Sequence, residues 1–213
     1  MAIGNIFKII GLCTIFSSCN TIFVVPHRVK RDLQCYDGKP IEPGKQINLN
    51  GYYTRTGGLL PSGDTIYLNY FFFKDGIFIS RIEYGRDHKR NLEEYIKKVL
   101  EHNEKREEGV NYGSYKISND TIMTQFFYFA AAGTKGGGQL WFKVSGPEQI
   151  KSIYAQNLGE GKYNKGGPIK EKNQAILTFI QTSIPTDANS WFKEKKWFWC
   201  KEAWDNRIPN SKN

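Results

Sequence analysis

The chain has 213 residues, a length typical of one domain with its own hydrophobic core. It carries 30 Lys and Arg against 21 Asp and Glu, which gives a formal net charge of +9. The Lys residues are spread along the sequence, so we expect the charge to favour solubility over one concentrated binding patch. There is no C-x-x-C pair and the three His are scattered, so we predict no metal site and no cofactor.

The first 20 residues have the pattern of a secretory signal. Lys8 precedes the apolar run 9–16, which is too short to span a bilayer as a helix. The tetrad Phe16-Ser17-Ser18-Cys19 resembles the lipobox of bacterial lipoprotein precursors, with Phe where Leu is usual. In that class the cysteine receives a diacylglyceryl group, the chain is cut before it, and the new amino group is usually acylated. The resemblance therefore implies a signal peptide over residues 1–18 and lipidation of Cys19.

The same resemblance predicts a location in the cell envelope. Asn20 follows the cysteine in place of the Asp that signals inner-membrane retention, which implies the outer membrane. Loss of residues 1–18 would remove Lys8 and leave a net charge of +8. In this compartment we expect basic residues to meet anionic headgroups or acidic glycans, and no nucleic acid. Two alternatives stay open: residues 9–25 form an uncleaved anchor, or Cys19 is an ordinary cysteine after an ordinary signal peptide.

The remaining cysteines frame the predicted domain. Residues 19–34 are basic after the lipid site and are predicted to form a lipidated tether near the membrane. We expect the folded domain over 35–204 and a tail over 205–213. Cys35 and Cys200 are left as one pair in an oxidising compartment, so we predict a disulfide between them. Two buried free thiols are the alternative.

Eight segments have the composition of β-strands. Asp75-Gly76 and Asn119-Asp120 separate two pairs of them and are typical of hairpin turns. The Gly-rich segment 133–139 lacks the ending of a phosphate-binding loop and is predicted to be a flexible hairpin loop. The predicted strands are 46–56, 64–73, 77–84, 112–118, 121–129, 139–144, 149–156 and 175–182.

One segment has the period of a helix. Apolar residues recur at helical spacing over 91–108, with Asn91 as the expected cap and Gly109 as the expected stop. We expect the apolar stripe of this amphipathic helix to pack on the sheet. The aromatic C-terminal segment 191–204 alternates around Trp197 and is predicted to be a last strand. We favour an element that closes a barrel mouth or a sheet edge over an exposed glycan-binding platform.

Together these elements predict a mainly β fold. Eight antiparallel strands with hairpin turns suggest a lipocalin-like barrel or a strongly bent sheet, with one packed helix. The opening Gly51-Tyr52-Tyr53 resembles the G-x-W of lipocalins but lacks the Trp, so no ligand residue of that family is carried over. A two-layer α+β sheet with helix 91–108 on one face is the alternative.

Aromatic residues lie on both faces of two predicted strands, so both faces need cover. An orientation that sends the polar Asn69 and Gln125 outward makes the opposite faces the barrel interior. The candidate ligand-pocket residues are then Tyr70, Phe72, Phe126, Tyr128 and Trp141. Trp141 fits this set least well, because it shares its face with Lys143.

No catalytic residue is assigned from the sequence. There is no G-x-S-x-G motif, and nothing marks one Ser as a nucleophile. We therefore predict an envelope-anchored, non-catalytic binding module. Its partners would be the membrane, through the N-terminal lipid, and a small apolar ligand, a glycan or an envelope protein. An envelope hydrolase with an unrecognised active site is the alternative.

Overall fold

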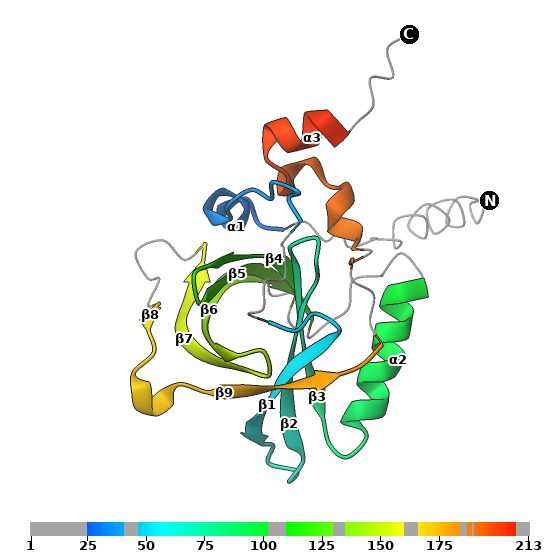
Figure 1. Cartoon of the computed structure of the whole chain (residues 1–213), viewed down its shortest axis with the longest axis vertical. Coiled ribbons are helices and arrows are strands. Elements are labelled where there is room, and N and C mark those ends of the chain that lie inside the picture. The colour runs from blue at the N-terminus through cyan, green and yellow to red at the C-terminus, as the bar shows by residue number, and fades with distance from the viewer. Residues whose placement is uncertain are drawn as a thin grey trace, which may run out of the picture.

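The structure is a computed structural model that describes residues 25–40, 47–101, 110–129, 135–159, 166–183, 187–188 and 190–207. The predicted signal peptide and Cys19 lie outside these residues. The described chain is one antiparallel sheet that closes on itself (Figure 1). Its strands are β1 (Gly51–Leu59), β2 (Thr65–Phe72), β3 (Ile77–Tyr84), β4 (Val110–Ser118), β5 (Thr121–Phe129), β6 (Lys135–Gly146), β7 (Gln149–Leu158), β8 (Gly167–Pro168) and β9 (Ile176–Gln181).

The sheet is a closed eight-stranded barrel, with the short β8 paired on the side of β7. Strands β1 to β7 follow one another as an up-and-down meander. Strand β9 then pairs with β7 on one side and with β1 on the other, which completes the ring. The prediction of a lipocalin-like barrel is confirmed. The alternative of an open two-layer sheet is wrong, because the barrel leaves no free edge between β1 and β7.

All eight predicted strands form, and two have the predicted bounds. The Gly-rich segment differs from its prediction, because residues 135–139 belong to β6. A Cβ at Gly136 would overlap the Tyr128 ring, and one at Gly138 would lie 2.7 Å from the Phe126 ring. The glycines therefore make room for two aromatic rings that cross over them from β5. Close approach, and not flexibility, explains this glycine run.

Helix α2 (His88–Glu101) follows β3 and lies along the outside of the barrel (Figure 1). Its Leu92 and Tyr95 are buried against the barrel wall, as predicted for the packed helix. The predicted cap is wrong, because Asn91 lies inside the helix and its N–H donates to the carbonyl of Asp87. The predicted stop at Gly109 lies outside the described residues.

Two apolar clusters occupy the two sides of the barrel wall. The interior cluster has members on all eight barrel strands and is therefore the barrel core. The outer cluster lies between the wall and the segments that cover it, which are α2, an N-terminal arm (residues 25–40) and the C-terminal segment. Burial on both sides explains why β2 and β5 carry aromatic residues on both faces.

The N-terminal arm, residues 25–40, packs on the barrel. It contains the short helix α1 (His27–Asp32), whose Val29 is fully buried. A Cβ at Gly137 or at Gly159 would contact this valine closely, so both glycines leave space for it. Part of the segment predicted as a tether is therefore seated on the outer wall.

The C-terminal segment is not a last strand. It forms two 3-10 helices, η5 (Trp191–Glu194) and η6 (Lys196–Phe198), and then helix α3 (Lys201–Arg207). Only Trp199 pairs as a strand residue, in an isolated bridge with Tyr36. The rings of Trp191, Phe192 and Trp197 pack around Phe127 on the outer wall. The segment therefore covers a wall of the barrel instead of a mouth or an edge.

Candidate functional site

The barrel interior contains most of the predicted pocket residues. Tyr70, Phe72 and Phe126 are buried members of the interior cluster, and Tyr128 packs against it half-buried. Trp141 is not among them. Its neighbour Phe142 belongs to the interior cluster, so alternation along β6 directs Trp141 to the outside. There it stacks on Tyr154 of β7, with ring centroids 4.4 Å apart. The inward placement of Trp141 is therefore corrected.

The two polar residues used to choose this orientation do face outward, but they are buried. Asn69 accepts a hydrogen bond from Thr54 Oγ1 at 2.8 Å, on the wall beside α2. Gln125 lies under the N-terminal arm. Alternation could assign them to the outer face, but it could not show that this face is covered.

One end of the interior is filled in part by the segment before β1. We call it the Pro147 end, after the turn between β6 and β7. Ile47 and Leu49 fill it from the segment before β1, and both are buried in the interior cluster. Tyr53 fixes this segment, because its hydroxyl donates to the carbonyl of Pro147 at 2.7 Å and accepts the N–H of Asn48 at 3.0 Å.

The buried phenols of the interior hold their protons tightly. Burial raises the pKa of Tyr53 to about 12, partly offset by the hydrogen bond from Asn48. Burial also raises the pKa of Tyr115, whose hydroxyl donates to the carbonyl of Phe73 at 2.8 Å. For Tyr70 burial again raises the pKa, while the positive charge of Arg55 opposes the increase.

The other end of the interior, which we call the α2 end, is less deeply buried. Interior-directed side chains near this end are only half-buried, whereas those in the middle are buried. The half-buried apolar members include Ile66, Leu68 and Ile82. Solvent therefore reaches apolar side chains that point into the barrel.

A row of polar residues lies between this half-buried layer and the packed core. Cross-strand pairing sets side by side Tyr70 of β2, Ser80 of β3, Asn111 of β4 and Tyr128 of β5. We call these four residues the interior polar row. Asn111 Nδ2 donates to Ser80 Oγ at 2.8 Å, which fixes the middle of the row. Ser80 and Asn111 could not be identified from sequence patterns, because the faces they occupy are evident only from the strand register.

Arg55 of β1 is the charged residue of this region. It pairs with Leu68, a residue that packs on the interior cluster, so it also points inward. Its side chain is half-buried, and its charge acts on the nearby phenol of Tyr70. None of the described carboxylates forms an ion pair with it. The β1 segment around Arg55 has mixed polarity, so the sequence did not indicate that this side chain points inward.

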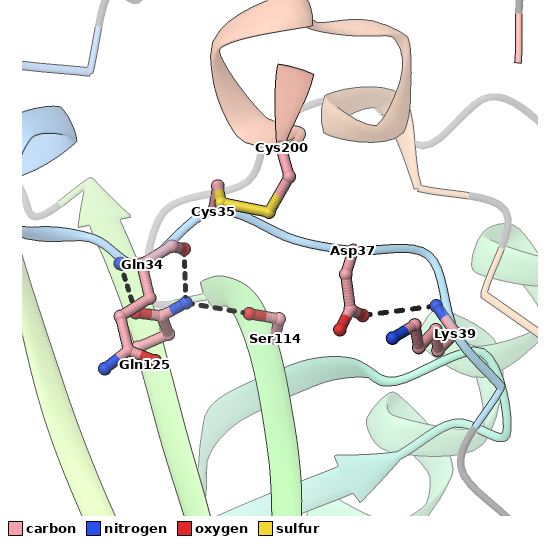
Figure 2. The surroundings of a disulfide bond; sticks show 7 residues. All are labelled: Gln34, Cys35, Asp37, Lys39, Ser114, Gln125 and Cys200. Atoms are coloured by element: carbon pink, nitrogen blue, oxygen red, sulfur yellow. Dashed lines mark hydrogen bonds between the residues drawn. A yellow bond between two sulfur atoms is a disulfide. The ribbon is translucent and has the colours of Figure 1, made fainter. Parts of the chain in front are cut away.

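The outer wall carries two adjoining pockets, of about 120 and 130 Å³. Both are lined by Gln34, Ser114 and Gln125, so the contact of the N-terminal arm with the wall separates them. The larger pocket also borders the disulfide at Cys35. Figure 2 shows the arm beside this disulfide, with the Gln125 amide turned toward the main chain of Gln34.

Cys35 and Cys200 form the predicted disulfide, with Cα atoms 4.8 Å apart. Beside it, the main chains of Tyr36 and Cys200 are also joined, since the N–H of Cys200 donates to the carbonyl of Tyr36 at 2.8 Å. The arm and the C-terminal segment are therefore held together by covalent and hydrogen bonds at one place.

Charged side chains elsewhere form structural contacts. Lys193 donates to Asp75 Oδ2 at 2.6 Å, and burial nevertheless raises the pKa of this carboxyl. Arg81 pairs with Glu83 and lies over the Tyr95 ring, 4.0 Å from its centroid. Within the part of the chain that is described, no three His, Cys, Asp or Glu residues are grouped as metal ligands.

Comparison searches find no protein-family model, no curated protein and no solved structure that matches this chain. Within the described ranges, no helix has the length and apolar character needed to cross a bilayer. Any functional interpretation therefore depends on the residues of the chain itself.

Proposed function

We propose that the protein is a lipoprotein of the bacterial cell envelope, anchored at the outer membrane by acylated Cys19, that binds a small apolar ligand without catalysis. The lipobox-like tetrad supports the anchor. The ligand would bind inside the barrel at the α2 end. The single observation that carries this proposal is the half-buried state of apolar side chains that point into the barrel there.

Covering exposed apolar surface would provide the free energy for ligand binding. Removing apolar area from water is worth roughly 25 cal/mol per Å². Leu68 and Ile82 are paired across β2 and β3, point inward by strand alternation and are only half-buried. A ligand that covers them gains this energy without any rearrangement of the packed half of the core. Eight strands enclose about the right width for one small ligand.

Catalysis has less support. His88 stacks on Tyr67, and the buried Glu83 is paired with Arg81. In the described residues these groups lie outside the barrel, and the interior-directed positions include no carboxylate and no imidazole. An acid or base for hydrolysis would have to come from elsewhere.

Ligand binding can be tested with the neutral fluorescent probe N-phenyl-1-naphthylamine. The full chain in lipid nanodiscs should enhance probe fluorescence above empty nanodiscs. Leu68→Gln should weaken binding, because it places an amide in the proposed site. The control is Leu59→Gln, at a position that is 71% exposed. The proposal is wrong if the wild type shows no enhancement, or if both variants bind equally well.

The anchor is tested separately. The full-length gene is expressed in a bacterium with a fatty-acid analogue, beside a Cys19→Ser variant. We expect label on the wild type alone. Equal labelling of both chains would rule out acylation at Cys19.

A further inference from the structure

The interior polar row and Arg55 together place polar and charged side chains inside the barrel. By strand alternation, Arg55 is the one charged side chain among the described interior-directed positions. The group beside it is the neutral phenol of Tyr70. A guanidinium carries five donors, and a neutral phenol beside it brings no opposite charge.

Partial burial of an unpaired cation is unfavourable, because water is removed and no opposite charge replaces it. The most direct compensation is an anion bound beside Arg55. Two further groups could hydrogen-bond such an anion. Asn111 is half-buried next to Ser80, and the Tyr128 hydroxyl has no hydrogen-bond partner in the described part of the chain.

The residues on the two sides of the interior polar row also favour one orientation of a bound ligand. On the Pro147 side of the interior polar row lie the packed rings of Phe72 and Phe78. On the α2 side lie the half-buried apolar side chains of Ile66, Leu68 and Ile82. A charged group is therefore favoured at the level of the row, and an apolar chain is favoured between the row and the α2 end.

We propose that the ligand is a single-chain amphiphile with a carboxylate head, which pairs with Arg55 and is hydrogen-bonded by Tyr70, Asn111 and Tyr128. Its tail extends toward the α2 end. This inference rests on the proposed function, since it specifies the ligand of the same interior site. The anionic head is the new element, and it makes Arg55 the residue that determines specificity.

The test compares decanoate with decanol, which share a chain length and differ in charge. Each displaces N-phenyl-1-naphthylamine from the full chain in nanodiscs, with empty nanodiscs as the blank. Charged hydrogen bonds predict a preference of roughly 10- to 100-fold for decanoate. Arg55→Met should abolish this preference and leave decanol binding. Arg55→Lys should restore part of it.

The matched control is Lys116→Met, which removes the same charge from an exposed position on the outer face of β4. It should keep the preference for decanoate. Loss of the preference in this control would mean that net charge, and not Arg55, attracts the anion. Equal binding of both compounds to the wild type overturns the carboxylate inference and leaves the proposed function standing. Binding of neither compound, with no probe signal, overturns the proposed function itself.

Discussion

The side-chain amide of Gln125 pairs with the main chain of Gln34 through two hydrogen bonds. Gln125 Oε1 accepts the N–H of Gln34 at 2.7 Å, and Gln125 Nε2 donates to the Gln34 carbonyl at 2.6 Å (Figure 2). The amide also donates to Ser114 Oγ at 3.1 Å. One buried side chain therefore attaches the N-terminal arm to the barrel wall.

Replacing this amide with a carboxylate should release the arm. In Gln125→Glu the donor is lost, and a buried carboxylate faces the Gln34 carbonyl oxygen. We expect unfolding free energy to fall by about 1–3 kcal/mol, the usual cost of an unsatisfied buried polar group. Protease cleavage within residues 25–34 should become faster. Gln139→Glu, on the paired position of β6, is the control and should cleave at the wild-type rate.

Reduction of the disulfide should lower stability without opening the barrel. The Cys35–Cys200 bond spans 165 residues, and such bonds typically contribute about 2–5 kcal/mol in small secreted domains. The double variant Cys35→Ala/Cys200→Ala should unfold at lower urea concentration and keep its β-type circular dichroism. A midpoint equal to that of the oxidised wild type would contradict this expectation.

Gly113 should tolerate no side chain. A Cβ there would overlap the main-chain carbonyl of Gln125 on the neighbouring strand, which cannot move without breaking the pairing. We expect Gly113→Ala to cost about 1–3 kcal/mol, as for other overpacked sites. Gly146→Ala is the matched control, because a Cβ at Gly146 meets nothing within 4 Å. Urea unfolding of both variants tests this prediction, and equal unfolding midpoints would disprove the overlap.

Tyr53 should make stability depend on pH in the alkaline range. Its folded pKa of about 12 lies above the ordinary 10.0, so the folded state binds the phenolic proton more tightly than the unfolded state. This contribution is present below pH 10 and is lost as pH rises toward 12. It amounts to roughly 2–3 kcal/mol.

The measurement is the unfolding free energy in urea between pH 9 and pH 12. Tyr53→Phe should be less stable at pH 9, because it lacks both hydrogen bonds of the hydroxyl, and should lose less stability on going to pH 12. The exposed Tyr84→Phe is the control, and its curve should run parallel to that of the wild type. Parallel curves for Tyr53→Phe and wild type would contradict the assignment.

Local patterns were sufficient to predict the strands and the barrel. Aromatic and β-branched runs with turn pairs at Asp75-Gly76 and Asn119-Asp120 identified the meander, and Gly76 and Asn119 do adopt positive φ. The cysteine count identified the disulfide. The turns depend on residues close in sequence, and the disulfide depends on the pairing of two cysteines. Both could therefore be recognised without the fold.

The candidate site depends on the strand register, which the residue composition of the strands does not determine. Trp141 was placed inward with the other aromatic residues, although its face also carries Lys143 and the face of Phe142 is wholly apolar. Arg55, Ser80 and Asn111 come from three strands, and only the register of β1 to β4 brings them to the same part of the wall as Tyr70. The C-terminal segment has the alternation of a strand, but packing of Trp197 on Phe127 decides its conformation.

The disulfide also changes the connectivity of the molecule. Every barrel strand lies between Cys35 and Cys200, so the oxidised protein is a covalent ring with two short ends. Cleavage of a single peptide bond in any barrel loop would convert this ring into a linear chain and would release no fragment. A protease would have to cut at two loops, or meet a reductant first, before any part of the barrel could separate from the part that carries the N-terminus.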